Sequence, residues 1–385
     1  MRTARFRSLI RPHLSHTLAS TLRKVQRFIP APLVPAEAFR RVLATASALP
    51  AALSNGIYME CRLAGDDQRV DLVLNVDDRG RAIINGDNPF ARLHNAIGDD
   101  PAWTAVRELC AEWANPASPL AEHIRRIWLE LDDGGSGDGK PAIPAPGVFV
   151  KLAPERRETL SPERWSETAA AVLRPLYGGP LPDRVASTLE RCFRELPGDA
   201  FVYYLGSFRS RGTDAVRLCV VDVTEDALPD YLRRIGYADW QGVGELVTQM
   251  HPPHGEPRPQ LKLVQLEIGD EVGERIGLEY VLDRPAQMRG GVRERGFVEM
   301  LVARGLCTPA RRDGLLAWPG YTFEELDHEL WPSLVRRRVN HVKLVHRPGR
   351  PLEAKGYICL FHQFHRRAAP HTREVGDGRR TLVPA

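Results

Sequence analysis

The sequence has no apolar run approaching the roughly 18 residues that a membrane-spanning helix needs, so we expect no integral membrane segment. It also lacks paired cysteines. Its six cysteines lie far apart, and several sit inside apolar runs, as Cys219 does in VRLCVVD. Isolated cysteines in apolar surroundings predict buried free thiols in a reducing compartment, and we therefore expect a cytoplasmic protein.

Several motifs that identify active sites are absent. There is no Gly-rich phosphate loop, no dinucleotide-binding fingerprint and no Gly-x-Ser-x-Gly around a serine. The aspartate pairs do not continue as Asp-Asp-x-x-Asp, so a magnesium cluster built on that motif is not indicated. The sequence argues against P-loop, Rossmann-type and serine-hydrolase chemistry, and we expect no metal ligands in the site.

Positive charge is concentrated at the N-terminus. Residues 1–36 hold seven Lys or Arg and no Asp or Glu, which leaves 46 basic against 49 acidic residues in the rest of the chain. A nearly neutral main body argues against a nucleic-acid partner. We interpret residues 1–36 as a basic N-terminal extension with a helix. A transit peptide and a membrane-surface helix are the alternatives.

Pairs of strand-like runs recur along the chain. Five times, two short runs rich in β-branched and aromatic residues follow each other across a turn, and helical stretches separate one pair from the next. The last pair is the clearest, with VNHVKLVH and EAKGYICLF joined by a Pro- and Gly-containing turn. The expected strand pairs are 57–63 with 70–76, 127–131 with 148–152, 200–208 with 215–222, 261–268 with 275–282, and 339–346 with 353–361.

The segments between the strand pairs show helical spacing of apolar residues. Ser161 and Pro162, for example, open one of these segments with a capping residue and a proline in the first turn. The expected helices are 35–53, 103–114, 119–126, 161–176, 182–196, 224–236, 240–250, 292–304, 308–316 and 322–336.

Ten strands joined two by two predict one closed sheet. Parallel βαβ units would need single strands alternating with helices. We therefore predict an α+β fold in which five αββα repeats form a ten-stranded antiparallel barrel with an outer ring of helices, over residues 37–365. Residues 366–385 have few apolar side chains and are expected to be a flexible tail. The alternative is two α+β domains, each with an open sheet.

Each strand pair carries a cation within an apolar strand. Burying an unpaired cation is costly, so several of them converging inside a barrel would suit an anionic ligand. Alternatively, each cation reaches solvent or pairs with a carboxylate across the sheet, as Lys343 with Glu353 and Lys262 with Glu279 would. The cations are Arg62, Lys151, Arg217, Lys262, Lys343 and Lys355.

Two strands place charged and aromatic side chains on one face. Because strand residues alternate between faces, Lys355 and Tyr357 share a face, and so do Tyr58, Glu60 and Arg62. The simplest interpretation of Glu60 is that it is an ordinary salt-bridge partner.

The repeated αββα pattern, the Lys355-Gly-Tyr357 spacing and the FVKLAP stretch around Lys151 resemble the aromatic prenyltransferases of the ABBA or PT-barrel fold. The resemblance covers about residues 37–362. It implies transfer of an isoprenoid group from a diphosphate donor to an aromatic or peptide-borne acceptor in secondary metabolism. No cofactor would be required, although Mg²⁺ is possible.

The resemblance also implies roles for individual residues. The six cations would bind the diphosphate, Tyr203 and Tyr357 would shield the allylic cation, and Glu60 would be the catalytic base. Further candidates for the shield are Tyr58, Tyr204 and Tyr280.

The sequence departs from this family where tyrosine is expected two residues beyond a strand cation. Ala153, Cys219, Val264 and Val345 occupy these positions. Aromatic faces stabilise a cation, so fewer tyrosines weaken the expected shield. The alternative function is therefore a non-catalytic barrel that binds a ligand or peptide, as a carrier or as a partner in a biosynthetic complex.

Overall fold

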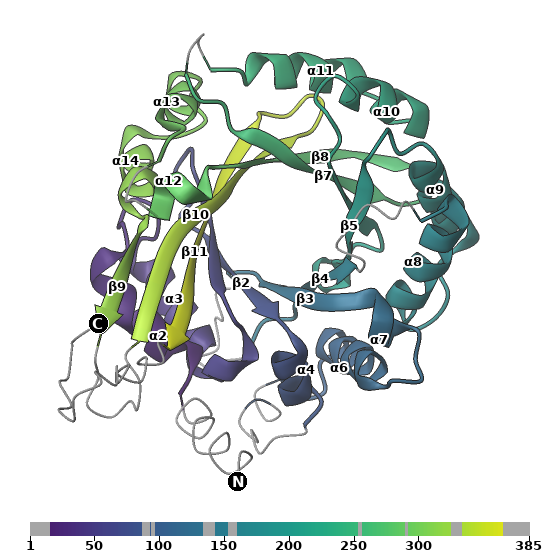
Figure 1. The fold of residues 1–385 in the computed structure, drawn as a ribbon, viewed down its shortest axis with the longest axis horizontal. Coiled ribbons are helices and arrows are strands. Elements are labelled where there is room, and N and C mark those ends of the chain that lie inside the picture. The colour runs from purple at the N-terminus through teal and green to yellow at the C-terminus, as the bar shows by residue number, and fades with distance from the viewer. Residues whose placement is uncertain are drawn as a thin grey trace, which may run out of the picture.

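The computed structural model describes residues 16–86, 93, 97–133, 143–152, 160–252, 256–288, 292–324 and 333–364. Its eleven strands form one antiparallel sheet, which closes where β10 pairs with β11 (Figure 1). Ten of the strands make the closed barrel, as predicted, and β9 adds to one end of β10. The strands are β1 Ile57–Arg62, β2 Val70–Val76, β3 Ile124–Leu131, β4 Gly147–Leu152, β5 Phe201–Ser207, β6 Val216–Val221, β7 Gln260–Ile268, β8 Val272–Val281, β9 Gly320–Glu324, β10 Ser333–His346 and β11 Glu353–Phe364.

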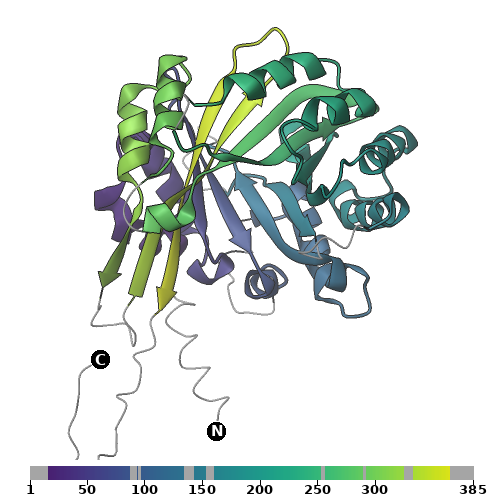
Figure 2. The same cartoon turned by 45° about the horizontal axis from the view of Figure 1, so that its top comes forward.

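The helices lie outside the barrel and follow the strand pairs around it (Figures 1 and 2). The hydroxyl of Ser161 accepts a hydrogen bond from the Arg164 amide at the start of α8, which confirms the predicted cap. The helices are α2 Leu18–Val25, α3 Ala36–Ser47, α4 Asp78–Ile84, α6 Pro101–Ala114, α7 Leu120–His123, α8 Pro162–Tyr177, α9 Asp183–Arg194, α10 Leu228–Ile235, α11 Trp240–Gln249, α12 Arg284–Met288, α13 Arg295–Ala303 and α14 Pro309–Ala317.

Two expected helices are wrong in part. The described ends of the expected helix 322–336, residues 322–324 and 333–336, are strands, because Gly320–Glu324 forms β9 and β10 begins at Ser333. Leu and Arg are good helix formers, but pairing of Ser333–Arg337 with β9 and β11 outweighs that local preference. The expected helix 119–126 ends at His123, since Ile124 already pairs with Leu152 across the sheet.

Strand β10 is long enough to have two different neighbours on one edge. Its first part, Ser333–Arg337, pairs with β9, whereas its second part, His341–His346, pairs with β8. Gln287 of α12 fills the gap between them. Its amide donates to the Val339 carbonyl (3.0 Å) and accepts from the Val339 amide (2.8 Å), so both backbone groups are satisfied where the neighbours change.

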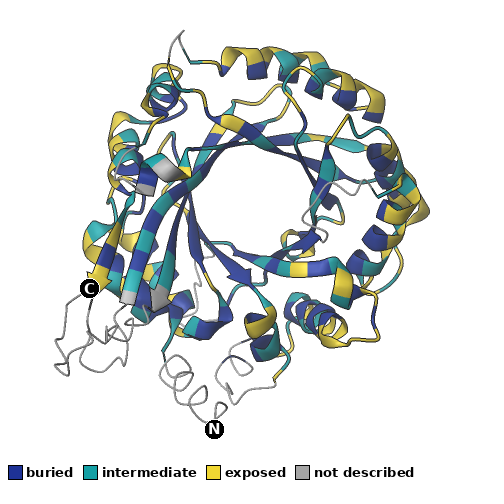
Figure 3. Cartoon of the chain, in the orientation of Figure 1, coloured by how far each residue is buried: buried dark blue, intermediate teal, exposed yellow. Residues whose placement is uncertain are grey.

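The main hydrophobic core lies between the barrel and the helices. Alternate strand residues such as Met59, Leu74 and Leu218 belong to the same buried cluster as Leu22 of α2 and Trp103 of α6. Figure 3 shows the strands mainly buried and the outer helix faces exposed. The other strand residues face the interior of the barrel, which we call the lumen.

The six cysteines are all buried and form no disulfide, as predicted. None of the described helices has the length and apolar character of a membrane-spanning segment. Of the basic extension 1–36, the described part includes α2, whose Leu18, Leu22 and Val25 are buried. The expected tail 366–385 lies outside the described residues.

Candidate active site

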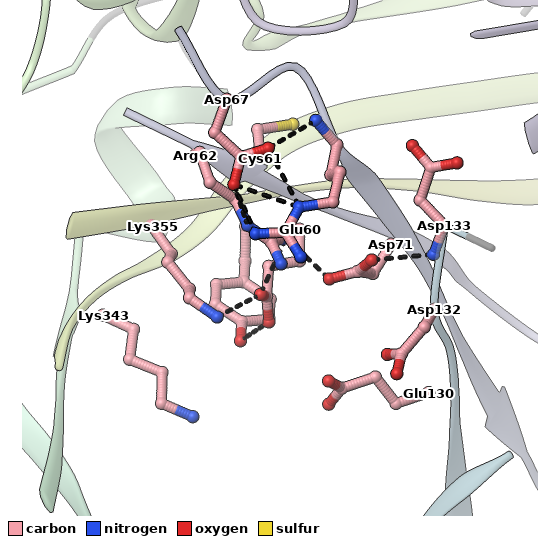
Figure 4. A network of polar contacts seen from close by, with 12 residues as sticks. Glu60, Cys61, Arg62, Asp67, Asp71, Glu130, Asp132, Asp133, Lys343 and Lys355 are labelled. Carbon is pink, nitrogen blue, oxygen red and sulfur yellow. Dashed lines mark hydrogen bonds and ion pairs between the residues drawn. The ribbon is translucent and has the colours of Figure 1, made fainter. Parts of the chain in front are cut away.

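Glu60 lies on the lumen face of β1 and is 2% exposed. Its carboxylate accepts hydrogen bonds from the Lys355 ammonium (2.7 Å) and from the Tyr357 hydroxyl, and it forms an ion pair with Arg62 (3.1 Å). The register between β1 and β11 causes this arrangement, because Glu60 is opposite Tyr357 and Arg62 is opposite Lys355. Figure 4 shows the contacts of Glu60 with Lys355 and Arg62.

The cations around Glu60 determine its protonation. Burial alone would raise the pKa of this carboxyl group, but attraction from Lys355, Arg62 and Lys343 outweighs it and holds the pKa well below its usual range. Glu60 is therefore a carboxylate at neutral pH.

Asp71 of β2 lies beside Glu60 and shares Arg62 with it. The Arg62 guanidinium lies 2.6 Å from the Asp71 carboxylate, which also accepts from the Asp133 amide (2.9 Å). Burial and then the Glu60 charge raise the pKa of Asp71 to about 6, although Arg62 opposes the shift. Of these neighbouring carboxyl groups, Asp71 is the one that takes up a proton more readily.

Three buried carboxylates face one another in the lumen. One oxygen from each of Glu60, Asp71 and Glu130 lies within 4.8 Å of the others. Oxygen ligands of this kind suit Mg²⁺. However, Arg62 already pairs with Glu60 and Asp71, while Arg211 pairs with Glu130. A metal ion would have to displace these guanidinium groups, so the residues present do not fit one well and we assign it no step.

Lys343 of β10 is the predicted cation with the most deeply buried ammonium. It donates to the neutral side-chain amide of Gln265 and lies 3.7 Å from Glu279. Burial lowers the pKa of Lys343, although Glu279 opposes the shift. Gly277 leaves room for this side chain, because a Cβ atom there would lie 2.7 Å from the Lys343 Cε atom.

Arg217 of β6 also faces the lumen. It pairs with Glu267, while its Nε atom is buried with no hydrogen-bond partner. Burial, together with the nearby Arg275, lowers the pKa of Arg217 to about 10. Cys219, two residues after Arg217 on β6, is opposite Gln265, the hydrogen-bond partner of Lys343, so Arg217 and Lys343 both lie on this part of the lumen face.

Lys151 and Lys262 differ in their surroundings. The buried Lys151 ammonium lies 4.7 Å from the centre of the Tyr203 ring, inside the barrel. Lys262 is partly exposed near the start of β7, where it pairs with Asp222 and not with Glu279. Glu279 instead faces Lys343, for which we had expected Glu353. Five of the six predicted cations thus face the lumen, and Lys262 stands apart from them.

Aromatic rings cover another part of the lumen. We call these six residues the aromatic belt: Phe361, Tyr58, Trp128, Tyr204, Tyr203 and Phe149. Neighbouring ring centroids lie 4.5 to 6.3 Å apart, mostly edge to face. Trp128, Phe149 and Phe361 were not among the predicted site residues. Strict alternation puts Phe149 on the same face of β4 as Lys151, and Phe361 on the same face of β11 as Lys355, whereas no predicted charge on β3 marks the face of Trp128.

The predicted shielding tyrosines have different positions. Tyr203 belongs to the aromatic belt. Tyr357 faces the lumen and stacks on His341 with centroids 4.0 Å apart. Tyr280 does not face the lumen, because it packs against Phe297 of α13 in the outer core. Trp128, Phe149 and Phe361 thus add aromatic rings to the lumen beyond the predicted tyrosines.

Comparisons with known proteins identify the fold. No protein-family model and no curated protein matches the chain. Among solved structures, the apo prenyltransferase PriB matches with a TM-score of 0.50 at 15% identity, over 89% of this chain and 96% of that one. PriB in ternary complex with L-tryptophan and dimethylallyl thiolodiphosphate matches with the same TM-score, identity and coverage. The 5-dimethylallyltryptophan synthase from Streptomyces coelicolor matches at 14% identity with a TM-score of 0.43, over 89% and 97%.

At this identity the two PriB matches establish the architecture. They agree with the closed ten-stranded antiparallel barrel and its surrounding helices. The chain has the PT-barrel fold of the aromatic prenyltransferases, as the repeated strand pairs predicted.

Proposed function

We propose that this protein transfers an isoprenoid group from a diphosphate donor to an aromatic ring. The observation that carries the proposal is that three kinds of side chain lie together in the lumen of the barrel. The lumen holds a buried carboxylate at Glu60, several cations and a belt of aromatic rings. Each of the three is needed for a different part of such a reaction.

The cations would bind the diphosphate and help it leave. In the transfer, the bond between the allylic carbon and the diphosphate oxygen breaks, and the electron pair stays on the diphosphate. Cations placed around that oxygen stabilise the developing charge. Lys343 and Arg217 can donate further hydrogen bonds to a diphosphate, because Lys343 bonds mainly to a neutral amide and the Nε atom of Arg217 has no partner. Lys151 and Lys355 would add charge from neighbouring strands.

The aromatic belt would protect the allylic cation. Ring faces attract cations, and rings exclude water that would otherwise capture the intermediate. Tyr203, Tyr204 and Trp128 offer such faces, and Tyr357 offers another beside Glu60.

Glu60 would complete the substitution. The attacked ring carbon forms a new carbon–carbon bond and must then lose its proton. The resulting cation is a strong acid, so even a carboxylate with a lowered pKa accepts this proton. Glu60 is ionised at neutral pH and lies next to the belt residue Tyr58 along β1.

The names of the similar structures support a transferase over a carrier. PriB is named a prenyltransferase, and one PriB complex holds L-tryptophan and a dimethylallyl thiolodiphosphate. For this chain we propose a small aromatic acceptor, with a peptide-borne ring as the second form. Turnover of an isoprenoid diphosphate with any such acceptor would exclude the non-catalytic alternative.

Calorimetric titration with dimethylallyl thiolodiphosphate tests the donor site. We expect the wild-type protein to bind it and Lys343→Ala to bind it about tenfold more weakly or worse, because hydrogen bonds to charged groups are worth about 1.5–3 kcal/mol. Lys262→Ala is the matched control, since Lys262 is partly exposed and pairs with Asp222. No heat with the wild type, or equal affinities in all three proteins, would contradict the proposal.

A further inference from the structure

A separate pocket of about 270 Å³ lies where the pairing partner of β10 changes from β9 to β8. Figure 2 shows β9, β10 and β11 extending together from this end of the barrel, with α12 beside them. Arginines dominate its lining. The pocket is lined by Arg284, Gln287, Gly320, Tyr321, Leu334, Arg336, Arg337, Arg338 and Phe361, and we call it the arginine pocket.

The charges in this pocket are not balanced in the way that the lumen cations are. In the described part of the chain, no carboxylate forms an ion pair with Arg284, Arg336, Arg337 or Arg338. The Nε atoms of Arg336, Arg337 and Arg338 are buried and have no hydrogen-bond partner. Buried guanidinium donors without partners are costly, and adjacent positive charges repel one another.

Arg337 has a structural role that explains its position. Its guanidinium lies 3.7 Å from the centre of the Phe28 ring and 5.6 Å from that of Trp318, so it packs between aromatic rings. Arg336 and Arg338 share the opposite face of β10. Arg338 lies 4.4 Å from the centre of Phe361, a ring that itself lines the pocket, whereas no ring contact is found for Arg336 among the described residues.

The pocket joins the aromatic belt. Phe361 lines the pocket and contacts Tyr58, with centroids 5.7 Å apart. Tyr58 is two residues before Glu60 on the same face of β1, so the pocket leads toward Glu60 along this strand. A ligand held by its acidic end at Arg338 would therefore have its apolar part along Phe361 and Tyr58, directed toward Glu60.

We propose that Arg284, Arg336 and Arg338 form an oxyanion site that binds the carboxylate or phosphate of an aromatic acceptor. Guanidinium groups bind such oxyanions through two parallel hydrogen bonds, and Phe361 and Tyr321 provide apolar contact beside them. This inference rests on the proposed function, because the ligand is an acceptor only if the protein is a transferase. It assigns the acceptor to the class of aromatic acids.

Binding of three small probes tests the site. They are 3-phenylpropionate, phenyl phosphate and the neutral 3-phenylpropan-1-ol, each titrated into the wild type, Arg336→Gln/Arg338→Gln and the matched double control Arg347→Gln/Arg350→Gln. Arg347 and Arg350 are exposed in the turn at the other end of β10, so the control removes the same charge. The single variant Arg284→Gln serves as well if the first double variant does not fold, since Arg284 is exposed.

We expect the wild type and the control to bind an acidic probe and the pocket variants to bind it about tenfold more weakly or worse. The tighter of the two acidic probes identifies the natural group as carboxylate or phosphate. Equal binding of acidic and neutral probes, or unchanged affinity in the pocket variants, would overturn the site.

Titration of the same variants with dimethylallyl thiolodiphosphate separates this inference from the proposed function. Unchanged donor affinity in the pocket variants supports an acceptor site. If those variants lose the donor and keep the acidic probes, the acceptor assignment is wrong. If the wild type binds acidic probes through these arginines and never binds the donor, the oxyanion site is upheld and the transferase function fails.

Discussion

Glu60 shows how a few contacts determine the chemistry available to one residue. Lys355, Arg62 and Tyr357 surround its carboxylate, so it is ionised in spite of being buried. A carboxylate in this position can accept a proton but cannot donate one at neutral pH. The proposed reaction requires only acceptance.

Replacement of this carboxylate by an amide should therefore separate binding from catalysis. Glu60→Gln keeps the shape of the side chain and removes the proton acceptor, so we expect transfer to slow by about 10²-fold or more with donor affinity little changed. Transfer would be measured by chromatography of the prenylated acceptor. Glu271→Gln, in the exposed turn between β7 and β8, is the control. Full activity in Glu60→Gln would exclude Glu60 as the base.

Asp71 should make stability depend on pH in an unusual direction. Its pKa is about 6 in the folded protein and 3.8 in an ordinary environment. Between these values the folded state holds a proton that the unfolded state has released, so its contribution to stability grows as the pH falls from about 6 toward 4.

Asp71→Asn tests this linkage, because asparagine does not titrate. We expect the free energy of unfolding of the wild type, minus that of the variant, to rise as the pH falls through this window. Urea unfolding at several pH values measures the difference. A constant difference, or one that falls at lower pH, would contradict the raised pKa.

Among the elements, α12 has an influence larger than its five residues suggest. It supplies Gln287, which is 2% exposed and satisfies both backbone groups of Val339 where β10 changes neighbours. It also supplies Arg284 to the arginine pocket. The helix thus links closure of the barrel to the proposed oxyanion site.

Gln287→Ala should destabilise the fold by about 2 kcal/mol or more, because it leaves a buried amide and a buried carbonyl without partners. Denaturant unfolding measures the change. The exposed Gln68→Ala in the turn between β1 and β2 should have almost no effect. Equal stability of the two variants would show that water or a local shift satisfies Val339 instead.

The strands illustrate what the sequence could predict. Period-two alternation correctly placed Lys355 with Tyr357 and Glu60 with Arg62, because this pattern depends only on local geometry. It could not predict that Glu60 meets Lys355, since that contact depends on the pairing of β1 with β11, nearly 300 residues apart. The same limit explains why the segment 322–336 was expected to be a helix.

The sequence predicted the class of ligand better than it predicted the ion-pair partners of the cations. Cations inside apolar strands indicated an anionic ligand, and five of the six face the lumen. Their resident partners Glu60, Glu267 and Glu279 come from other strands, so sequence spacing gave the wrong carboxylate for Lys343 and Lys262. The arginine pocket was missed because Arg336 fell in the expected helix.

At the scale of the whole molecule, the barrel separates two tasks. Its outer face packs against helices to form the main core. Its inner face carries charged side chains, most of which form ion pairs with one another, and a separate group of aromatic rings. A closed sheet leaves few exposed strand edges and so can hold polar groups inside without losing its shape. We propose that this interior binds an isoprenoid diphosphate for transfer.

A crystal structure of the protein with dimethylallyl thiolodiphosphate tests that claim most directly. We predict the diphosphate between Lys343, Arg217 and Lys355, with the isoprenoid chain against the aromatic belt and its allylic carbon facing the side of the lumen that holds Glu60. A donor bound outside the barrel, or a lumen that stays without it at saturating concentration, would contradict the account.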